Sequence, residues 1–179
     1  KAINFLWEKG FDATSMNDLV EKLGINRASM YDTYGNKNQL YELSLSKYSK
    51  QVAKQLADFL YYQTNVRQGL YLSFENAIDS ILQLQESRGC FIVNATTEMA
   101  NSNLQVKQLC FENKVAIEQV YFNYLQYGVN QGQISPYKNI KSIASHLYNL
   151  QNGLNVISKI QSNKIELMLL VSNGLTILD

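Results

Sequence analysis

Hydrophobic positions along the chain recur every three to four residues, which is the period of amphipathic α-helices. In the stretch that begins at Ser15, one such stripe consists of Met16, Leu19, Val20 and Leu23. No segment shows the sustained alternation of apolar and polar residues that is typical of half-buried strands. The pattern therefore predicts an all-α fold.

Capping residues and breaks divide this pattern into a series of helices. Gly10 ends the first helix, Asn101-Ser102-Asn103 is a polar break with good capping residues, and Ser135-Pro136 marks a turn. A further turn is expected near residues 87–89. The expected helices cover about residues 1–9, 16–23, 27–34, 37–62, 65–84, 90–100, 104–131, 140–160 and 164–178.

The second and third of these helices are short and are joined by a tight turn. Ser15 is the expected N-cap, and Asp18 completes a pair similar to a capping box. Gly24 can adopt the left-handed conformation that ends a helix, and Asn26 can cap the next one. This layout predicts a helix-turn-helix, whose second helix enters the major groove of DNA.

The same stretch resembles the signature of TetR-type transcriptional regulators. The residues that carry the resemblance are Gly10-Phe11, Thr14-Ser15, Leu19-Val20, Gly24-Ile25, Ser29-Met30-Tyr31, Tyr34-Gly35-Asn36-Lys37 and Leu40. A less specific similarity to many members is Arg88-Gly89-Cys90-Phe91 with Asn94 and Glu98. The resemblance implies a helix-turn-helix DNA-binding domain at residues 1–46 and a helical effector-binding and dimerisation domain at residues 47–179.

The expected DNA contacts follow from the resemblance and from side-chain chemistry. Hydroxyls and cations can bind phosphates, while small residues let a helix approach the base edges. The candidate DNA-binding residues are Thr14, Ser15, Arg27, Ala28, Ser29, Tyr31, Thr33 and Lys37. Met30 is expected in the core, and Tyr34 in the family's buried aromatic position. Asp32 departs from the family pattern, because a carboxylate that faced phosphates would be repelled.

Aromatic and polar residues in the second part of the chain are candidates for an effector pocket, although such a stripe is also typical of plain core. These candidates are Phe74, Phe91, Asn94, Glu98, Phe111, Tyr121 and Tyr124. Cys90 follows Gly89 at a helix start, where the helix N-terminus and Arg88 could lower the pKa of a redox-sensing thiol. Cys110 and the single histidine, His146, are expected in the core or an interface, and no metal site or cofactor is expected.

Composition narrows the class of protein further. Lys and Arg (16) nearly balance Asp and Glu (15), so any contact with nucleic acid must come from a local patch. No apolar run is long enough to span a membrane, and two cysteines do not make a disulfide framework. We expect a cytoplasmic protein, and the start at Lys1-Ala2-Ile3 suggests that some N-terminal sequence is absent. Glycine-rich phosphate loops and nucleophile motifs are missing, which argues against an enzyme.

These observations predict a homodimeric repressor that a small molecule releases from a pseudo-palindromic operator in double-stranded DNA. The last two helices, 140–160 and 164–178, are apolar on more than one face and are the expected dimer contact. Two alternatives remain open. One is a thiol-based redox or electrophile sensor that acts through Cys90, and the other is a helical interaction module that no longer binds DNA.

Overall fold

The computed structural model describes residues 1–83 and 88–179. Within these residues the chain forms nine α-helices, a short final 3-10 helix and no strand, so the predicted all-α fold is confirmed. The expected helix boundaries agree with the observed ones to within a few residues. The expected turn near residues 87–89 lies in part outside the described residues.

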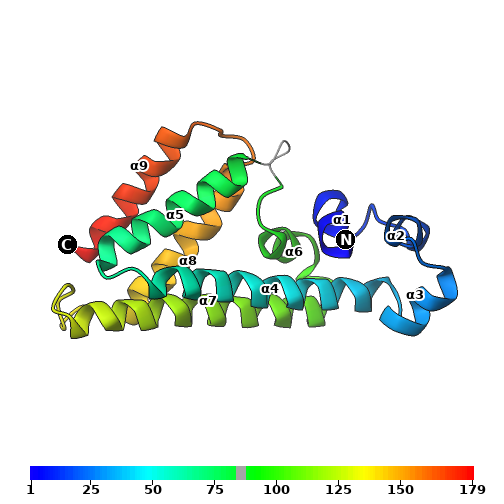
Figure 1. Cartoon of the computed structure of the whole chain (residues 1–179), viewed down its shortest axis with the longest axis horizontal. Helices are drawn as coiled ribbons and strands as arrows, with labels where there is room; N and C mark the ends of the chain where they lie inside the picture. Colours follow the sequence, from blue (N-terminus) through cyan, green and yellow to red (C-terminus); the bar gives the residue numbers. More distant parts are fainter. Residues whose placement is uncertain (84–87) are drawn as a thin grey trace.

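The first three helices form a small head at one end of the molecule (Figure 1). They are α1 (Ala2–Lys9), α2 (Met16–Leu23) and α3 (Arg27–Tyr34). Gly10 and Gly24 end α1 and α2 with positive φ angles, which glycine adopts without steric cost. The connection between α2 and α3 is therefore a tight turn, whereas a short loop, residues 10–15, joins α1 to α2.

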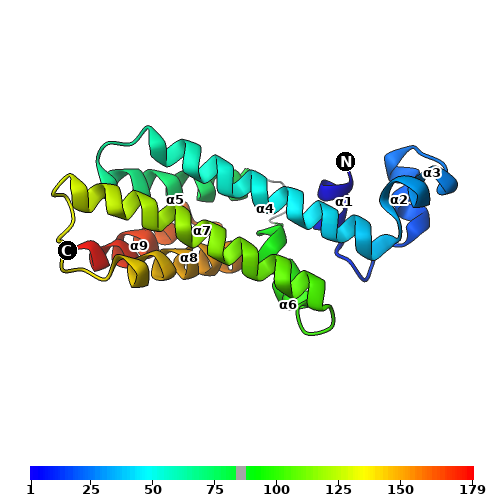
Figure 2. The same ribbon diagram turned by 90° about the horizontal axis from the view of Figure 1, so that it is seen from below.

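Two long helices run side by side along the molecule, as both ribbon views show (Figures 1 and 2). The first, α4 (Lys37–Tyr61), starts in the head, where Asn36 and Gln39 form the capping box that begins it. The second is α7 (Leu104–Asn130). Because α4 is continuous, the expected domain boundary at residues 46/47 falls inside one helix and stays a prediction.

The remaining helices complete a body at the other end. They are α5 (Val66–Leu82), α8 (Ile140–Ile157), α9 (Lys164–Gly174) and the 3-10 helix η1 (Leu175–Leu178). The short helix α6 (Phe91–Met99) packs mainly on α7 and also contacts α4 and α8, and together with α1 it lines a hollow next to the head. None of the helices in the described ranges is both long and apolar enough to cross a membrane.

Buried side chains form two separate cores. The core of the body joins α4, α5, α7, α8 and α9 through residues such as Leu70, Ile117 and Leu147. The core of the head contains Leu6, Leu19 and Met30, together with residues from α6 and the start of α7. The head core is thus built partly from residues far along the chain, which ties the position of the head to α6.

Candidate nucleic-acid interface and effector chamber

The helix-turn-helix is formed by local capping interactions. The N–H of Asp18 donates to Oγ of Ser15 over 3.1 Å, and the N–H of Ser15 donates to Oδ2 of Asp18 over 2.8 Å, which completes the capping box. Gly24 follows α2 in the left-handed conformation, with φ 69° and ψ 33°. Asn26 accepts a hydrogen bond from the N–H of Ser29 over 2.8 Å and begins α3. The short spacing from Ser15 to Asn26 thereby sets the orientation of α3.

Helix α3 projects from the head with nearly all of its surface exposed. Met30 is its one buried residue and anchors it to the head core, as expected. Ala28, Ser29 and Thr33 are exposed, and the guanidinium of Arg27 lies 5.8 Å from the ring centre of Tyr31. Five of the candidate DNA-binding residues therefore share one protruding helix.

Tyr34 and Asp32 also lie on the surface of α3. The expected buried position of Tyr34 is wrong in part, because Tyr34 remains exposed beside Asp32 on the rim where α3 meets α4. Asp32 has no ion pair with Lys37 among the described contacts, since the Lys37 ammonium points elsewhere. The carboxylate is therefore free to weaken contacts with phosphates next to α3.

Two of the candidate DNA contacts point into the protein instead. Thr14 is only 1% exposed, and its hydroxyl donates to the carbonyl oxygen of Gly10 over 2.6 Å. The Nζ of Lys37 donates to the carbonyl oxygens of Phe11 and Thr14, each over 3.0 Å, and lies 4.0 Å from the ring centre of Phe11. Both side chains hold the loop between α1 and α2.

Glu98 contacts the same loop from α6. Its Oε1 accepts the N–H of Phe11 over 3.1 Å and the N–H of Asp12 over 3.3 Å. Lys37 thus binds two carbonyl oxygens of the loop while Glu98 binds two of its N–H groups. The loop that precedes the helix-turn-helix is therefore fixed by α4 and by α6 together.

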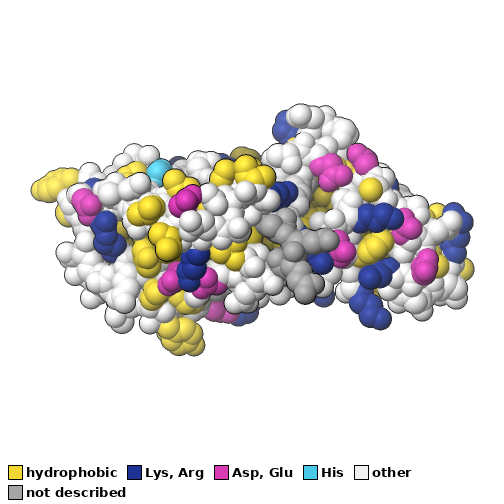
Figure 3. All heavy atoms as spheres, turned by 90° about the horizontal axis from the view of Figure 1, so that it is seen from above, with side chains coloured by type: hydrophobic (Ala, Val, Ile, Leu, Met, Phe, Trp, Pro, Cys, Tyr) yellow, Lys and Arg dark blue, Asp and Glu magenta, His cyan; other side chains and the backbone are white. Residues whose placement is uncertain are grey.

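Positive charge on the head is local and modest. Figure 3 shows Lys and Arg side chains gathered over the head and interspersed with acidic ones, while hydrophobic side chains gather over the body. Lys22 and Arg27 are exposed there, and Lys9 pairs with Asp18 over 2.8 Å. The hydrogen bond from Lys9, followed by that from the Ser15 N–H, holds the pKa of Asp18 at about 2. This surface suits a few defined phosphate contacts better than binding by bulk charge.

A chamber of about 270 Å³ opens between α4, α5, α7 and α8 in the body. Phe74 and Tyr121, two of the candidate effector residues, line it with their rings nearly parallel and 6.3 Å apart. The Tyr121 hydroxyl donates to Oε1 of Gln151 over 2.9 Å, and burial raises the pKa of Tyr121. None of the described residues that line the chamber is charged. It suits a compact, uncharged ligand with hydrogen-bonding groups.

Several chamber residues were not expected from the sequence. Val52, Leu56 and Phe59 of α4 face the chamber, and so do the polar residues Gln55 and Gln151. Gln151 is the one residue whose sequence position could have indicated a cavity, because it is a polar side chain on the inward face of an otherwise apolar helix. Periodicity alone could not separate a cavity wall from ordinary core.

The other candidate effector residues do not meet in this chamber. Tyr124 lines a second cavity, Phe91 is buried in the head core, and Phe111 lies exposed on the outer side of α7. The side chain of Asn94 donates to the carbonyl oxygen of Arg88 over 2.9 Å, and Glu98 binds the loop after α1. The expected effector set therefore divides between the body, the head and the surface.

Cys90 lies at the start of α6 beside Tyr48, whose hydroxyl is 3.7 Å from the sulfur. The charge of Arg88 is paired with Glu8 over 3.1 Å rather than directed at the thiol. Burial raises the pKa of Cys90 above its ordinary value, which is the opposite of the shift that a sensing thiol needs. Cys110 is buried in the head core, as expected.

The last two α-helices leave apolar side chains exposed. Val156, Ile165, Leu169 and Leu170 are all exposed, although α8 and α9 bury other residues in the body core. His146 joins the two helices, with Nε2 3.1 Å from the carbonyl oxygen of Gly174. Nowhere in residues 1–83 and 88–179 do three or more His, Cys, Asp or Glu side chains gather as a metal site would require.

A protruding helix of a helix-turn-helix, attached to a helical body that contains a chamber, defines a helix-turn-helix transcriptional regulator. Residues 1–43 match the family described as "Bacterial regulatory proteins, tetR family", and residues 68–170 match "Tetracyclin repressor-like, C-terminal domain". The chain belongs to the TetR family of DNA-binding transcriptional regulators.

Two curated relatives and one solved structure show how closely the chain matches other members. The uncharacterized HTH-type transcriptional regulator YezE of Bacillus subtilis is 24% identical over 180 residues, covering 100% of this chain and 93% of the relative. The HTH-type transcriptional repressor ComR of Escherichia coli is 23% identical over 160 residues, covering 89% and 76%. A cysteine mutant of the TetR family regulator CifR, complexed with a 26bp operator DNA, has 20% identity and a TM-score of 0.87, covering 99% and 93%.

Proposed function

We propose that this chain is a cytoplasmic, homodimeric repressor that binds a pseudo-palindromic DNA operator and is released from it by a small molecule. The observation that carries the proposal is the exposure of α3, which Met30 anchors while the rest of its surface stays free. The similarity to the repressor ComR and to CifR in complex with operator DNA supports the same function.

In this proposal α3 lies in the major groove. Ala28 and Ser29 are small enough to approach base edges, and Arg27 can read a guanine. Tyr31, Thr33 and Ser15 supply hydroxyls for phosphates, which fix the orientation of the helix without reading sequence. Lys37 and Thr14 contribute indirectly, because they hold the loop that precedes the helix-turn-helix.

Dimerisation through α8 and α9 would place two such heads on one duplex. The exposed apolar side chains on these helices support this contact, because an apolar patch of this kind is typical of a protein interface. A symmetric dimer reads two half-sites in inverted orientation.

The effector is expected in the chamber lined by Phe74, Tyr121 and Gln151. An effector releases DNA only if it binds the DNA-incompetent state more tightly than the competent one. The chamber touches α4, which continues into the head, so its occupancy can bias the position of the head.

Selection of binding sites from a random duplex library tests the proposal. We expect the wild-type protein to enrich an inverted repeat. Arg27→Ala and Ser29→Ala should change the enriched half-site, whereas Tyr31→Phe should weaken binding to all sequences equally. Tyr137→Phe is the control, because Tyr137 is exposed in the body, far along the chain from α3. Failure to enrich any motif, or wild-type behaviour of all three head variants, would contradict the proposal.

A further inference from the structure

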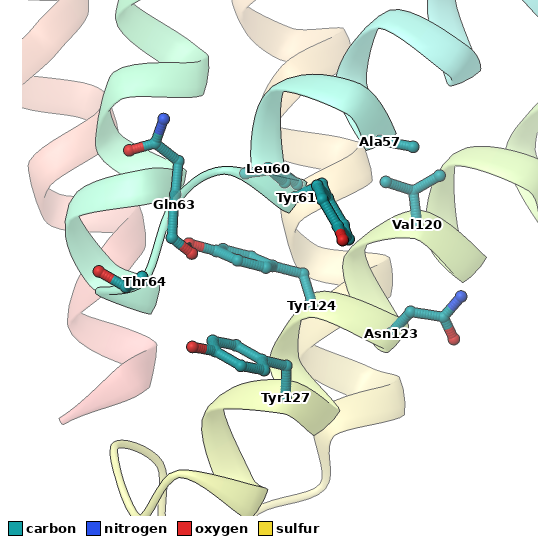
Figure 4. Close-up of a pocket in the computed structure, with 9 residues that line it drawn as sticks. All are labelled: Ala57, Leu60, Tyr61, Gln63, Thr64, Val120, Asn123, Tyr124 and Tyr127. Carbon is teal, nitrogen blue, oxygen red and sulfur yellow. Dashed lines mark hydrogen bonds between the residues drawn. The ribbon is translucent and has the colours of Figure 1, made fainter.

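A second cavity, of about 440 Å³, lies where the end of α4 meets the second half of α7 (Figure 4). Three tyrosine rings, from Tyr61, Tyr124 and Tyr127, form much of its wall, and the loop after α4 adds Gln63 and Thr64. Its volume falls in the range of about 300–1,000 Å³ that is typical of small-molecule sites.

This cavity is distinct from the chamber of the proposed function. The two share no lining residue, although both lie between α4 and α7. Val120 and Tyr124 of α7 face the second cavity, whereas Tyr121 faces the chamber. A ligand in one of them therefore leaves the other available.

The floor of the second cavity is held in place before any ligand binds. The hydroxyl of Tyr124 donates to the carbonyl oxygens of Gln63 and Asn65, at 3.2 Å each. A Cβ added to Gly69 would lie 2.1 Å from the Tyr124 hydroxyl oxygen, so glycine is needed for this close approach. Gln133 holds the same loop by donating from Nε2 to the carbonyl oxygen of Thr64 over 2.8 Å.

The walls define the chemistry of the ligand. None of the nine described residues that line the cavity carries a charge. Tyr61 is 81% exposed, and its ring contacts that of Tyr62 edge-to-face, with the ring centres 5.3 Å apart. The hydroxyl of Tyr127 has no partner among the described residues and can bind a polar group. Oδ1 of Asn123 accepts from Nε2 of Gln119 over 2.8 Å, which leaves the NH2 group of Asn123 to donate to a ligand.

We propose that this tyrosine-lined cavity is a second ligand site, which binds an uncharged, planar aromatic molecule carrying a hydroxyl or amino group. The ring of the ligand stacks against Tyr61, while the ring of Tyr127, itself stacked on Tyr124 at 6.2 Å, carries the hydroxyl that can bond to its polar group, as can Asn123 (Figure 4). Aromatic rings prefer offset-stacked or edge-to-face contacts of this kind. The site goes beyond the proposed function, which needs only the chamber.

Calorimetric titration of the full chain with 2-naphthol, in the absence of DNA, tests the proposal. We expect Tyr61→Ala to weaken binding by about threefold to tenfold, which is the worth of one aromatic stacking contact. Tyr137→Ala is the control, because Tyr137 is 96% exposed and does not line the cavity, whereas the ring of Tyr62 packs edge-to-face against Tyr61 at 5.3 Å. Both tyrosines are so exposed that neither change should unfold the protein, and Tyr127→Ala gives an independent second test.

Three further titrations locate the site and define its ligand class. Gln151→Leu alters the chamber and should leave the affinity for 2-naphthol unchanged. The anion 2-naphthoate and the cation tetraethylammonium should bind at least tenfold more weakly than 2-naphthol. The proposal is overturned if 2-naphthol does not bind, if Tyr61→Ala and Tyr127→Ala both bind like Tyr137→Ala, or if either ion binds more tightly. Because DNA is absent from these titrations, such a failure leaves the proposed repressor function untouched.

Discussion

Replacing Lys37 by methionine tests how the head is held together. Methionine keeps a long apolar side chain and removes the ammonium, which donates to the carbonyl oxygens of Phe11 and Thr14. The change therefore removes the clamp that α4 places on the loop after α1, while the contact of Glu98 with the same loop remains.

The magnitude follows from the contacts that are lost. Hydrogen bonds to charged groups contribute about 1.5–3 kcal/mol each, and Lys37 is only partly buried, so the low end applies to each of its two bonds. The cation–π contact with Phe11 adds about 0.5 kcal/mol. Since these terms are not fully additive, we expect a loss of about 2–3 kcal/mol. In a chain of this size that corresponds to a fall in Tm of about 5–10 °C.

Thermal unfolding followed by the fluorescence of Trp7 measures this loss, because Trp7 is the only tryptophan and lies in α1 beside Tyr48. Lys50→Met is the control: it removes the same charge from an exposed position of α4 and should change stability by less than about 0.5 kcal/mol.

The salt dependence of DNA binding separates this role from a direct contact with phosphate. A lysine that neutralises one phosphate contributes about 0.9 to the slope of log K against log salt concentration. If Lys37 acts by holding the loop, Lys37→Met lowers the affinity and leaves the slope unchanged. A slope reduced by about 0.9, with wild-type thermal stability, would show that Lys37 faces the DNA and would refute the reasoning.

Three other predictions concern the dimer, the thiol and the head at low pH. Leu169→Lys on α9 should give a monomer in light scattering, because it places a charge in the proposed interface, whereas Leu104→Lys on α7 should leave the assembly unchanged. Cys90 should react with iodoacetamide at pH 7.4 more slowly than a free cysteine, since burial raises its pKa; faster reaction would favour the thiol-sensing alternative. The pKa of Asp18 is lowered to about 2 by Lys9, so its contribution to stability is present above about pH 4 and is lost as the pH falls toward 2. Circular dichroism should show this acid-dependent loss in the wild type, and a loss of equal size in Asp18→Asn would contradict it.

Local chemistry explains why the sequence predicts the helices so well. Ser15, Gly24 and Asn26 act within a few residues of their own positions, so their roles can be inferred without knowledge of the fold. The assignment of Met30 to the core follows from the same short-range pattern.

The candidate sites were harder to predict because they depend on contacts between distant segments. Glu98 is 87 residues from Phe11, and nothing in its local sequence shows that α6 packs against the head. Phe91 lies on an apolar helix face, but periodicity could not tell which of the two cores it enters. For the same reason the sequence could not predict that Lys37 points into the protein or that Tyr61 lines a cavity.

The continuity of α4 has a geometric consequence. Its 25 residues extend about 37 Å at a rise of 1.5 Å per residue, so a tilt of about 5° at the end in the body displaces the end in the head by about 3 Å. In a symmetric dimer two such displacements change the separation of the recognition helices by up to about 6 Å. Major-groove sites one turn apart are separated by about 34 Å, so this change is enough to put one helix out of register when the other is seated. If the chain acts as the proposed ligand-released dimer, a small angular change at the body end of α4 would be amplified into a loss of fit to DNA.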